Sequence, residues 1–331
     1  MSNRPLISVI IPIYNSSKKI LNLLSQLRGQ SFKRFEVILI NDCSTDNTKI
    51  LIEDELIKKR DPRFRLISLK ENRGVSYARN VGIINSKGKY IIFIDADDYI
   101  DSNMLYEYLN RILKNNTDIE FFSMIRRTTG EKYPHYSQKF IGKIVDQRTL
   151  IMMYGNQQLT GFPFLYISKK ELWEDTNTSF NSCYSYQEDS LALLELIINS
   201  PEIKAGFNNL SFYTYNDNND SSKLNNLKLN DYKQAVKIDE LILLKVKEKF
   251  NNSIVCSYIL AHQLSNLINL IAFTIKNNYK LEYESARKKF IKIYLIAEGN
   301  LRLRLKRKIQ FYLLKYNCIS ILRCLSKRKI K

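Results

Sequence analysis

Short apolar runs alternate with amphipathic stretches over the first hundred residues of the chain. The runs are rich in β-branched residues and bounded by polar ones, which is typical of buried strands, and the stretches between them have helical spacing. Strands that alternate with helices predict an α/β fold with a mostly parallel central sheet flanked by helices. The predicted strands are residues 7–13, 35–40, 64–69 and 90–94, and the predicted helices are residues 18–27, 46–59 and 75–85.

Beyond residue 118 the pattern is mixed, and a polar segment divides it. Residues 216–226 are rich in Asp, Asn and Ser, so we place a domain boundary there. After it, residues 232–250, 254–275 and 283–297 have helical spacing and almost no Gly or Pro, which predicts a helical C-terminal region. Before it, the predicted strands are 119–125 and 203–215, the latter as a strand or a hairpin, and the predicted helices are 148–154, 168–174 and 190–198.

Composition narrows the class of protein. The chain has 331 residues, 44% of them hydrophobic, which suffices for a packed core and excludes disorder as a description of the whole chain. The five cysteines are scattered without CxxC spacing, which argues against a disulfide framework and a cysteine zinc site. No segment reaches the roughly 18 to 20 uninterrupted apolar residues of a spanning helix, and the first apolar run lacks a cleavage site. We therefore expect a cytoplasmic protein.

Charge is concentrated at the C-terminus. Lys and Arg number 52 against 33 Asp and Glu, a formal net charge of +19, and residues 299–331 carry eleven basic residues and no acidic one. The stretch 310–325 within them is apolar and aromatic, which favours a helix that binds an anionic membrane surface. Packing of this stretch on the domain is the first alternative. Contact with nucleic acid is less favoured, so no nucleic acid partner is expected.

Polar side chains follow the predicted strands at their carboxyl ends, where parallel sheets bind ligands. Asp95 and Asp97 directly follow one strand. Carboxylates crowded in this way repel one another, and a hard divalent cation such as Mg²⁺ or Mn²⁺ relieves that repulsion. Asp42 follows another strand. Gly74 opens a helix whose N–H groups favour phosphate, with Arg79 further along it.

These motifs resemble those of the family 2 glycosyltransferases with the GT-A fold. The matching segments are residues 7–15, 41–46, 72–82, 95–98 and, further on, 187–191. The resemblance implies a Rossmann-like GT-A catalytic domain over 1–220, with a nucleotide-sugar half over 1–100 and an acceptor half over 101–220. A helical region with the basic tail would occupy 221–331. The resemblance also implies transfer of a sugar from a UDP-linked donor with inversion at the anomeric carbon.

The resemblance assigns the donor-binding residues as well. Pro12 and Tyr14 would line the uracil and ribose pocket, and Asp42 would contact the uracil. Asp97 would bind the Mg²⁺ or Mn²⁺ that bridges the diphosphate, with Asp95, near the ribose, as a further metal ligand. The nucleotide-sugar site as a whole comprises Pro12, Tyr14, Asn15, Asp42, Asn72, Arg79, Asp95, Ala96 and Asp97.

A direct displacement with inversion also needs a base that takes the proton of the acceptor hydroxyl. By the same resemblance, Asp189 is this base and Glu188 supports it or positions the acceptor. The alternative is that both acids only favour the start of the helix that follows, an effect worth under about 1 kcal/mol. Trp173 is a candidate to stack on an acceptor sugar, and packing in a core is its alternative.

The sequence departs from the family pattern at several positions. Cys43 and Gln187 stand where the family often has Gly, and Cys43 is tolerated if the local backbone is not left-handed. Asn216 stands where the family often supplies Arg or His beside the diphosphate, and Lys223 is a candidate to replace that cation. Neither of the two histidines lies in a matched motif, so a histidine metal ligand is not expected.

The expected function is transfer of a sugar from a UDP-sugar to a hydroxyl of a growing bacterial surface glycan of the lipopolysaccharide or capsule type. The acceptor would be a glycan or a lipid-linked glycan, and the basic tail would hold the enzyme at the inner face of the cell membrane. A nucleotidyltransferase is an alternative, although residues 12–17 lack the glycine-rich loop that it would show. A non-catalytic protein that binds nucleic acid or membrane is another, and it leaves the acidic motifs without a role.

Overall fold

The computed structural model of the chain describes residues 4–133, 136–217, 226–250, 253–298 and 305–318. The chain folds as two compact units. Unit 1 consists of Met1–Leu150 and Thr160–Ser222, and unit 2 consists of Ile151–Leu159 and Lys223–Lys331.

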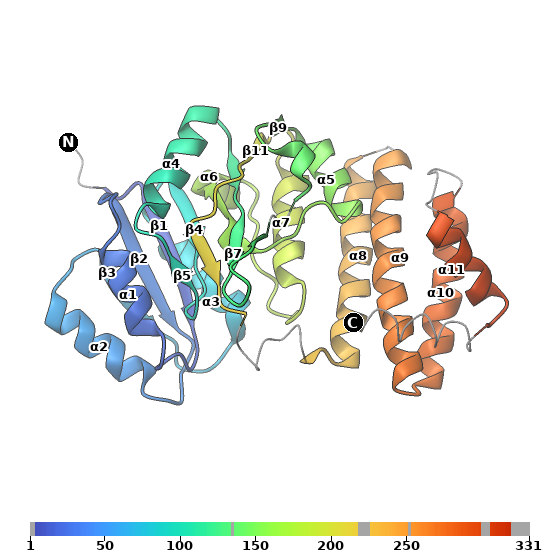
Figure 1. The fold of residues 1–331 in the computed structure, drawn as a ribbon, viewed down its shortest axis with the longest axis horizontal. Coiled ribbons are helices and arrows are strands. Elements are labelled where there is room, and N and C mark those ends of the chain that lie inside the picture. The colour runs from blue at the N-terminus through green and yellow to red at the C-terminus, as the bar shows by residue number, and fades with distance from the viewer. Residues whose placement is uncertain (1–3, 134–135, 218–225, 251–252, 299–304, 319–331) are drawn as a thin grey trace. The chain divides into compact units, whose positions relative to one another are not determined.

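Unit 1 is built on an eight-stranded sheet in the order β3-β2-β1-β4-β10-β6-β11-β9 (Figure 1). The first four strands in this order are parallel to one another, β10 runs antiparallel between β4 and β6, and β11 is parallel to β6. The carboxyl ends of β1, β2 and β4 therefore meet at one edge. The strands are β1 (Ile7–Ile13), β2 (Phe35–Asn41), β3 (Phe64–Ser68), β4 (Tyr90–Phe93), β6 (Ile119–Phe121), β9 (Ile144–Val145), β10 (Tyr166–Lys169) and β11 (Ala205–Phe207).

A second, smaller sheet has the order β5-β12-β7-β8, and helices complete the unit. Its strands are β5 (Tyr99–Ile100), β7 (Met124–Arg126), β8 (Lys132–Tyr133) and β12 (Tyr213–Tyr215). The helices are α1 (Ile20–Arg28), α2 (Thr48–Lys59), α3 (Gly74–Asn85), α4 (Met104–Asn115), α6 (Lys170–Asp175) and α7 (Glu188–Asn199), with short 3-10 turns at Gln138–Phe140 and Pro163–Leu165. Helix α5 (Gln147–Gly155) carries the chain from unit 1 into unit 2.

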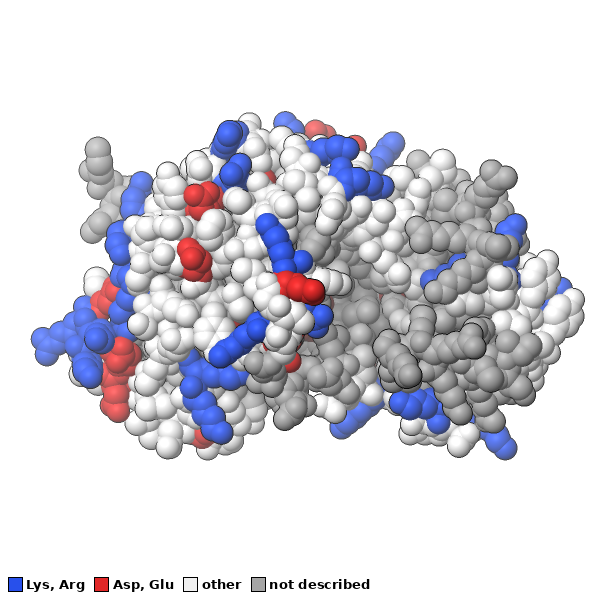
Figure 2. Space-filling view, viewed as in Figure 1, with Lys and Arg blue, Asp and Glu red and all other residues white. Residues whose placement is uncertain are grey.

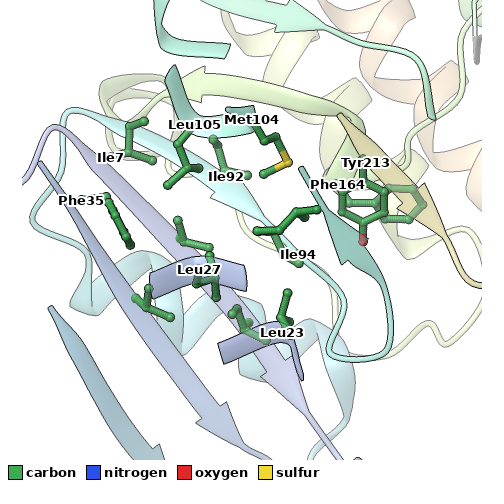
Figure 3. Close-up of a cluster of buried hydrophobic side chains, with 14 of the residues drawn as sticks. Ile7, Leu23, Leu27, Phe35, Ile92, Ile94, Met104, Leu105, Phe164 and Tyr213 are labelled. Atoms are coloured by element: carbon green, nitrogen blue, oxygen red, sulfur yellow. The ribbon is translucent and has the colours of Figure 1, made fainter. Parts of the chain in front are cut away.

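The core of unit 1 lies between the central sheet and the helices that cover it. Helix α1 buries four side chains at positions i, i+3, i+4 and i+7, the spacing of one helical face. Burial of each such leucine stabilises the fold by about 1.5–3 kcal/mol relative to exposure. Leu23 and Leu27 from this face belong to the same buried cluster as Ile7, and Phe164 stacks on Tyr213 at a ring distance of 4.8 Å (Figure 3).

The structure confirms the strands and helices predicted within the first hundred residues, with shifts of one or two residues at their ends. Three predictions further along the chain were wrong in detail. Residues 119–125 form two strands, β6 and β7, which belong to different sheets. Residues 203–215 likewise split into β11 and β12 instead of one strand or hairpin. Residues 168–169 end β10, so the helix predicted from 168 begins only at Lys170.

Unit 2 is helical, as the C-terminal pattern predicted. Its helices are α8 (Leu229–Lys249), α9 (Ser253–Lys276), α10 (Lys280–Glu298) and α11 (Leu305–Lys315), and α9 packs against both α8 and α10. Over Ile254–Lys276, α9 is long and apolar enough to cross a membrane by length and composition alone, but 61% of this window is buried within the chain. Core helices of soluble proteins have the same length and hydropathy. Polar residues also interrupt the apolar sequence of α9.

Two of those polar residues on α9 belong to a buried cluster around Asp239 of α8. His262 Nδ1 lies 2.8 Å from Asp239 Oδ1, and Asn266 donates to Asp239 Oδ2 at 2.7 Å. The hydroxyl of Tyr154 donates to the same carboxylate at 3.3 Å, and its ring stacks on His262. A buried carboxylate is costly unless it is hydrogen-bonded, which explains why these polar residues occur in an apolar helix.

The predicted boundary and the basic tail fall largely outside the described residues. Of the boundary segment 216–226, residues 218–225 are not described, and of the tail 299–331 only residues 305–318 are. On the visible face in Figure 2, the basic side chains of the described residues are dispersed instead of gathered in one patch.

We predict that Gly82→Ala destabilises unit 1. A Cβ at this position would lie 2.2 Å from Cγ2 of Ile10, a fully buried residue of β1, so the core side chain must shift. Overpacking of this kind costs about 1–3 kcal/mol, which exceeds the helix-propensity gain of up to about 1 kcal/mol. Denaturant unfolding should show a net loss of about 1–2 kcal/mol.

Ile84→Ala is the matched control on the same helix, because Ile84 is exposed. Its effect should stay within about 0.5 kcal/mol. A Gly82→Ala protein as stable as the wild type would contradict the close packing of α3 on β1.

Candidate functional site

A cavity of about 600 Å³ opens at the carboxyl ends of β1 and β4. Its wall comes from the end of β1 and the loop that follows it, from the loop between β2 and α2, from helix α3 and from the turn after β4. Of the residues predicted for the donor site, the structure brings seven to this wall. The lining residues are Pro12, Tyr14, Asn15, Ser16, Ser17, Lys18, Lys19, Asp46, Val75, Arg79, Asp95, Ala96 and Asp97.

The loop after β1 is held in place by the loop after β2. The Asn15 Oδ1 atom accepts a hydrogen bond from the backbone N–H of Thr45 at 2.8 Å. The carboxylate of Asp46 accepts hydrogen bonds from the backbone N–H groups of Ser17 at 3.3 Å and Thr48 at 3.0 Å. Burial alone would raise the pKa of Asp46, but the hydrogen bonds from Thr48 and Ser17 lower it to about 2. The loop is therefore fastened by a carboxylate that stays charged at neutral pH.

Asp42 and Asn72 lie at the start of α3, so their assignment to the donor site remains a prediction. The two carboxylate oxygens of Asp42 accept hydrogen bonds from the backbone N–H groups of Arg73 and Gly74, each at 2.8 Å. The amide of Asn72 donates to the carbonyl of Asp42 at 3.2 Å. Neither side chain is among the cavity's lining residues. In this structure both residues fix the start of α3, which carries Arg79.

Two carboxylates of the turn after β4 line the cavity. Asp95 Oδ1 lies 3.4 Å from Nη2 of Arg79, and Asp97 Oδ2 lies 3.4 Å from Nζ of Lys19. Burial raises the pKa of Asp95, and the Arg79 guanidinium opposes this rise. One or two carboxylates together with phosphate oxygens are the usual ligands of Mg²⁺ with a nucleotide, so Asp95 and Asp97 fit such an ion. The described part of the chain offers no cluster of three His, Cys, Asp or Glu side chains for a metal.

The third carboxylate of the turn, Asp98, faces the protein interior. It accepts hydrogen bonds from the hydroxyl of Tyr213 and, at 2.7 Å, from the backbone N–H of Asn216. The same hydroxyl accepts a bond from the N–H of Asp95 at 3.2 Å. Burial raises the pKa of Asp98 well above its ordinary value, and the charge of Asp95 adds to the rise. Asp98 therefore fastens β12 to the turn.

Asn216 belongs to this fastening. Its side-chain amide donates to the carbonyl of Asp97 at 3.0 Å, and the residue is buried. The side chain of Asn216 is thus bound to the backbone of the turn after β4. Lys223, predicted as a replacement for the family's cation at this place, lies outside the described residues.

Arg79 connects the turn after β4, through Asp95, to the start of α7. Its side chain is buried, with its other terminal nitrogen, Nη1, 3.5 Å from Oε1 of Glu188. The guanidinium also lies over the ring of Phe180 at 5.2 Å. Its Nε atom has no hydrogen-bond partner within the described ranges. A single buried cation therefore lies between Asp95 and Glu188.

Asp189 follows in the first turn of α7. Burial raises its pKa to about 6, the charge of Glu188 adds to the rise, and Arg79 opposes it. Gln187, just before the helix, has a left-handed backbone with φ of 59°. Gly161 packs against this turn so closely that a Cβ there would lie 2.4 Å from the Cα of Ser190. A carboxylate with a pKa near neutrality is suited to accept a proton from a substrate.

Trp173 lies in the core and not at the cavity wall. Its side chain is 2% exposed, stacks on Phe180 and donates its indole N–H to the hydroxyl of Ser168 at 3.0 Å. The structure therefore favours the core-packing alternative for this residue.

Sequence reasoning missed three residues that shape the site. Lys19 was not singled out because a lysine at a helix start carries no chemical motif, and its contact with Asp97 spans 78 positions. Tyr213 and Gly161 were missed because their partners, Asp98 and Ser190, are also distant along the chain. Finding them requires information on which distant residues are in contact, and a single sequence does not contain it.

Sequence comparison with known proteins gives three findings. A family model described as glycosyl transferase family 2 matches residues 8–184. An uncharacterized glycosyltransferase, EpsJ of Bacillus subtilis, is 29% identical over 217 residues, which cover 65% of this chain and 62% of the relative. A teichoic acid poly(glycerol phosphate) polymerase of Staphylococcus epidermidis is 38% identical over 112 residues, which cover 34% of this chain and 15% of the relative. The chain thus spans less than two thirds of the length of either relative.

A solved structure shares the fold over nearly the whole chain. It is that of S. aureus TarS 1-349 in complex with UDP-GlcNAc, with a TM-score of 0.74 and 21% sequence identity. The superposition covers 97% of this chain and 90% of the other. At this identity the likeness establishes the GT-A fold alone, with a mostly parallel sheet and a helical C-terminal region.

Proposed function

The chain belongs to glycosyl transferase family 2, and we propose that it transfers a sugar from a UDP-sugar to a hydroxyl of a bacterial cell-surface polymer, with inversion at the anomeric carbon. One observation carries the proposal. The cavity at the strand ends presents two carboxylates suited to a divalent cation, and Arg79 connects one of them, Asp95, to the start of α7, where the half-buried Asp189 has its pKa raised to about 6. The relative named for teichoic acid synthesis and the fold neighbour bound to UDP-GlcNAc support the donor and acceptor classes.

In the proposed complex, unit 1 holds the donor in the cavity. Pro12 and Tyr14 contact the nucleoside, and Asn15 and Ala96 line the wall. Asp97, with Asp95 beside it, would hold Mg²⁺ or Mn²⁺, which when bound neutralises the diphosphate and assists the departure of UDP as a Lewis acid. We assign the donor half to residues 1–100, the acceptor half to 101–220 and a helical region to 221–331.

Asp189 is the proposed general base. Inversion by direct displacement needs a base that takes the proton of the acceptor hydroxyl as the oxygen attacks the anomeric carbon. At pH 7 a carboxyl group with a pKa of about 6 is mostly ionised and can accept that proton. Glu188, held by Arg79, supports this carboxylate and positions the acceptor.

The proposed place of action is the cytoplasmic face of the cell membrane. The acceptor would be a glycan of the lipopolysaccharide or capsule type, free or linked to a lipid. The support for a membrane surface is the basic sequence of residues 299–331.

We predict that Asp189→Asn abolishes transfer while UDP still binds. Loss of a general base costs about 10²- to 10⁴-fold in rate, and the amide introduced by this substitution would keep the shape of the site. Asp97→Ala should instead lose metal-dependent UDP affinity. The measurement is UDP release from a panel of UDP-sugars with Mn²⁺ and a lipid-linked glycan extract, together with UDP binding by calorimetry.

The matched control is Asp54→Asn, because Asp54 is an exposed acid on α2 outside the cavity. It should retain both transfer and UDP affinity. If wild-type protein neither binds UDP nor releases it from any donor, the proposed function is wrong.

We predict that kcat/KM rises about tenfold per pH unit below pH 6 and levels off above it, because Asp189 must be deprotonated to act. The negative charge of Glu188 raises the pKa of Asp189. Glu188→Gln should therefore move this limb of the pH profile to lower pH. A limb that stays in place in Glu188→Gln would argue against Asp189 as the titrating base.

We predict that the full chain sediments with anionic vesicles and not with neutral ones. Each basic residue near an anionic surface contributes about 1 kcal/mol, so Lys327→Gln combined with Arg328→Gln and Lys329→Gln should weaken binding markedly. Salt should weaken it as well, because it screens the charges. Equal recovery of the wild type and the triple variant would remove the basic tail from the proposal.

A further inference from the structure

The contact between Lys19 and Asp97 joins a cation to the proposed metal ligand. Lys19 Nζ lies 3.4 Å from Asp97 Oδ2, and both side chains are about one-third exposed, at 31% and 36%. Both residues line the 600 Å³ cavity. Lys19 directly precedes α1, and its backbone N–H donates to the carbonyl of Ser16 at 3.0 Å. Since Ser17 is held by Asp46, the backbone that carries Lys19 is fixed at the cavity wall.

An ammonium group and a divalent cation compete for this carboxylate. A divalent ion bound to Asp97 would repel an ammonium group that remained within a few ångströms of the same oxygen atoms. Binding of the ion therefore favours the departure of Lys19 from Asp97. Its long side chain and partial exposure allow that movement, since a lysine is a compact charge on a flexible stem.

Arg79, a second cation at the cavity wall, is not available for such an exchange. Arg79 is buried and lies between Asp95 and Glu188. A donor that enters the cavity brings a diphosphate, whose charge exceeds what one such ion at two carboxylates neutralises. The displaced ammonium of Lys19 would then find its strongest partner in that diphosphate.

We propose that Lys19 exchanges Asp97 for the diphosphate of the donor when the divalent cation binds, so that one side chain couples metal loading to nucleotide binding. This inference rests on the proposed function. It makes Lys19 a binding residue of the donor complex and a competitor of the metal in the donor-free protein.

The test follows from the two opposite effects. In Lys19→Met the competitor is removed, so Mn²⁺ should bind the nucleotide-free protein more tightly. UDP, titrated at saturating Mn²⁺, should bind more weakly because it loses a cation. Each change should be about threefold to fivefold, the size expected for one partly exposed charge pair. Both affinities are measured by calorimetry on the full chain.

Two further variants sharpen the test. Lys19→Arg keeps the charge and should retain most of the UDP affinity that Lys19→Met loses. Lys18→Met removes an equal charge from a neighbour on the same wall and should change the affinity for Mn²⁺ much less. Circular dichroism confirms that each variant is folded.

The outcomes separate this inference from the function on which it rests. If the wild type binds neither Mn²⁺ nor UDP, the proposed function falls, and the role of Lys19 falls with it. If the wild type binds both and Lys19→Met leaves either affinity unchanged or weakens both, only the exchange is overturned. Opposite shifts in Lys19→Met, with UDP affinity restored in Lys19→Arg, support it.

Discussion

The buried guanidinium of Arg79 is the interaction on which the rest of the site depends. It lies between Asp95, from the turn after β4, and Glu188, from the start of α7, and its charge also opposes the rise in the pKa of Asp189. Without a cation at this point, Asp95 would face the two acids at the start of α7, Glu188 and Asp189, in a poorly solvated space. Removal of one partner from a buried ion pair costs about 3–5 kcal/mol, so the two halves of the site are held together by charge.

Local periodicity was sufficient to predict the main strands and helices of the first hundred residues and the helical C-terminal region. Residues buried on one face of a strand or a helix recur at a regular spacing, which is visible in the sequence. Periodicity failed where neighbours distant along the chain decide the structure. The strand β10 is inserted antiparallel between β4 and β6, and nothing in residues 166–169 indicates that pairing. Residues 119–125 break because their two halves pair with different sheets.

The same limit applies to the site. The strand-end position of Asp95 and Asp97 could be predicted, since a parallel sheet brings its carboxyl ends to one edge. The use of Asp42 to cap α3 could not, because it depends on the exact approach of one loop to another. Trp173 was equally ambiguous, since a tryptophan that stacks on a ligand and one that fills a core have the same sequence signal.

Several turns of unit 1, among them those at Cys43 and Gln187, bear a conformational cost that a glycine would avoid. Cys43 and Gln187 have φ of 55° and 59°, in the left-handed region, where a side chain costs roughly 1–2 kcal/mol per residue. Domains of this kind have a total stability of only about 5–15 kcal/mol. Unit 1 therefore has less margin for further substitutions, and we expect glycine at turns such as those of Cys43 and Gln187 to increase its tolerance of random mutation.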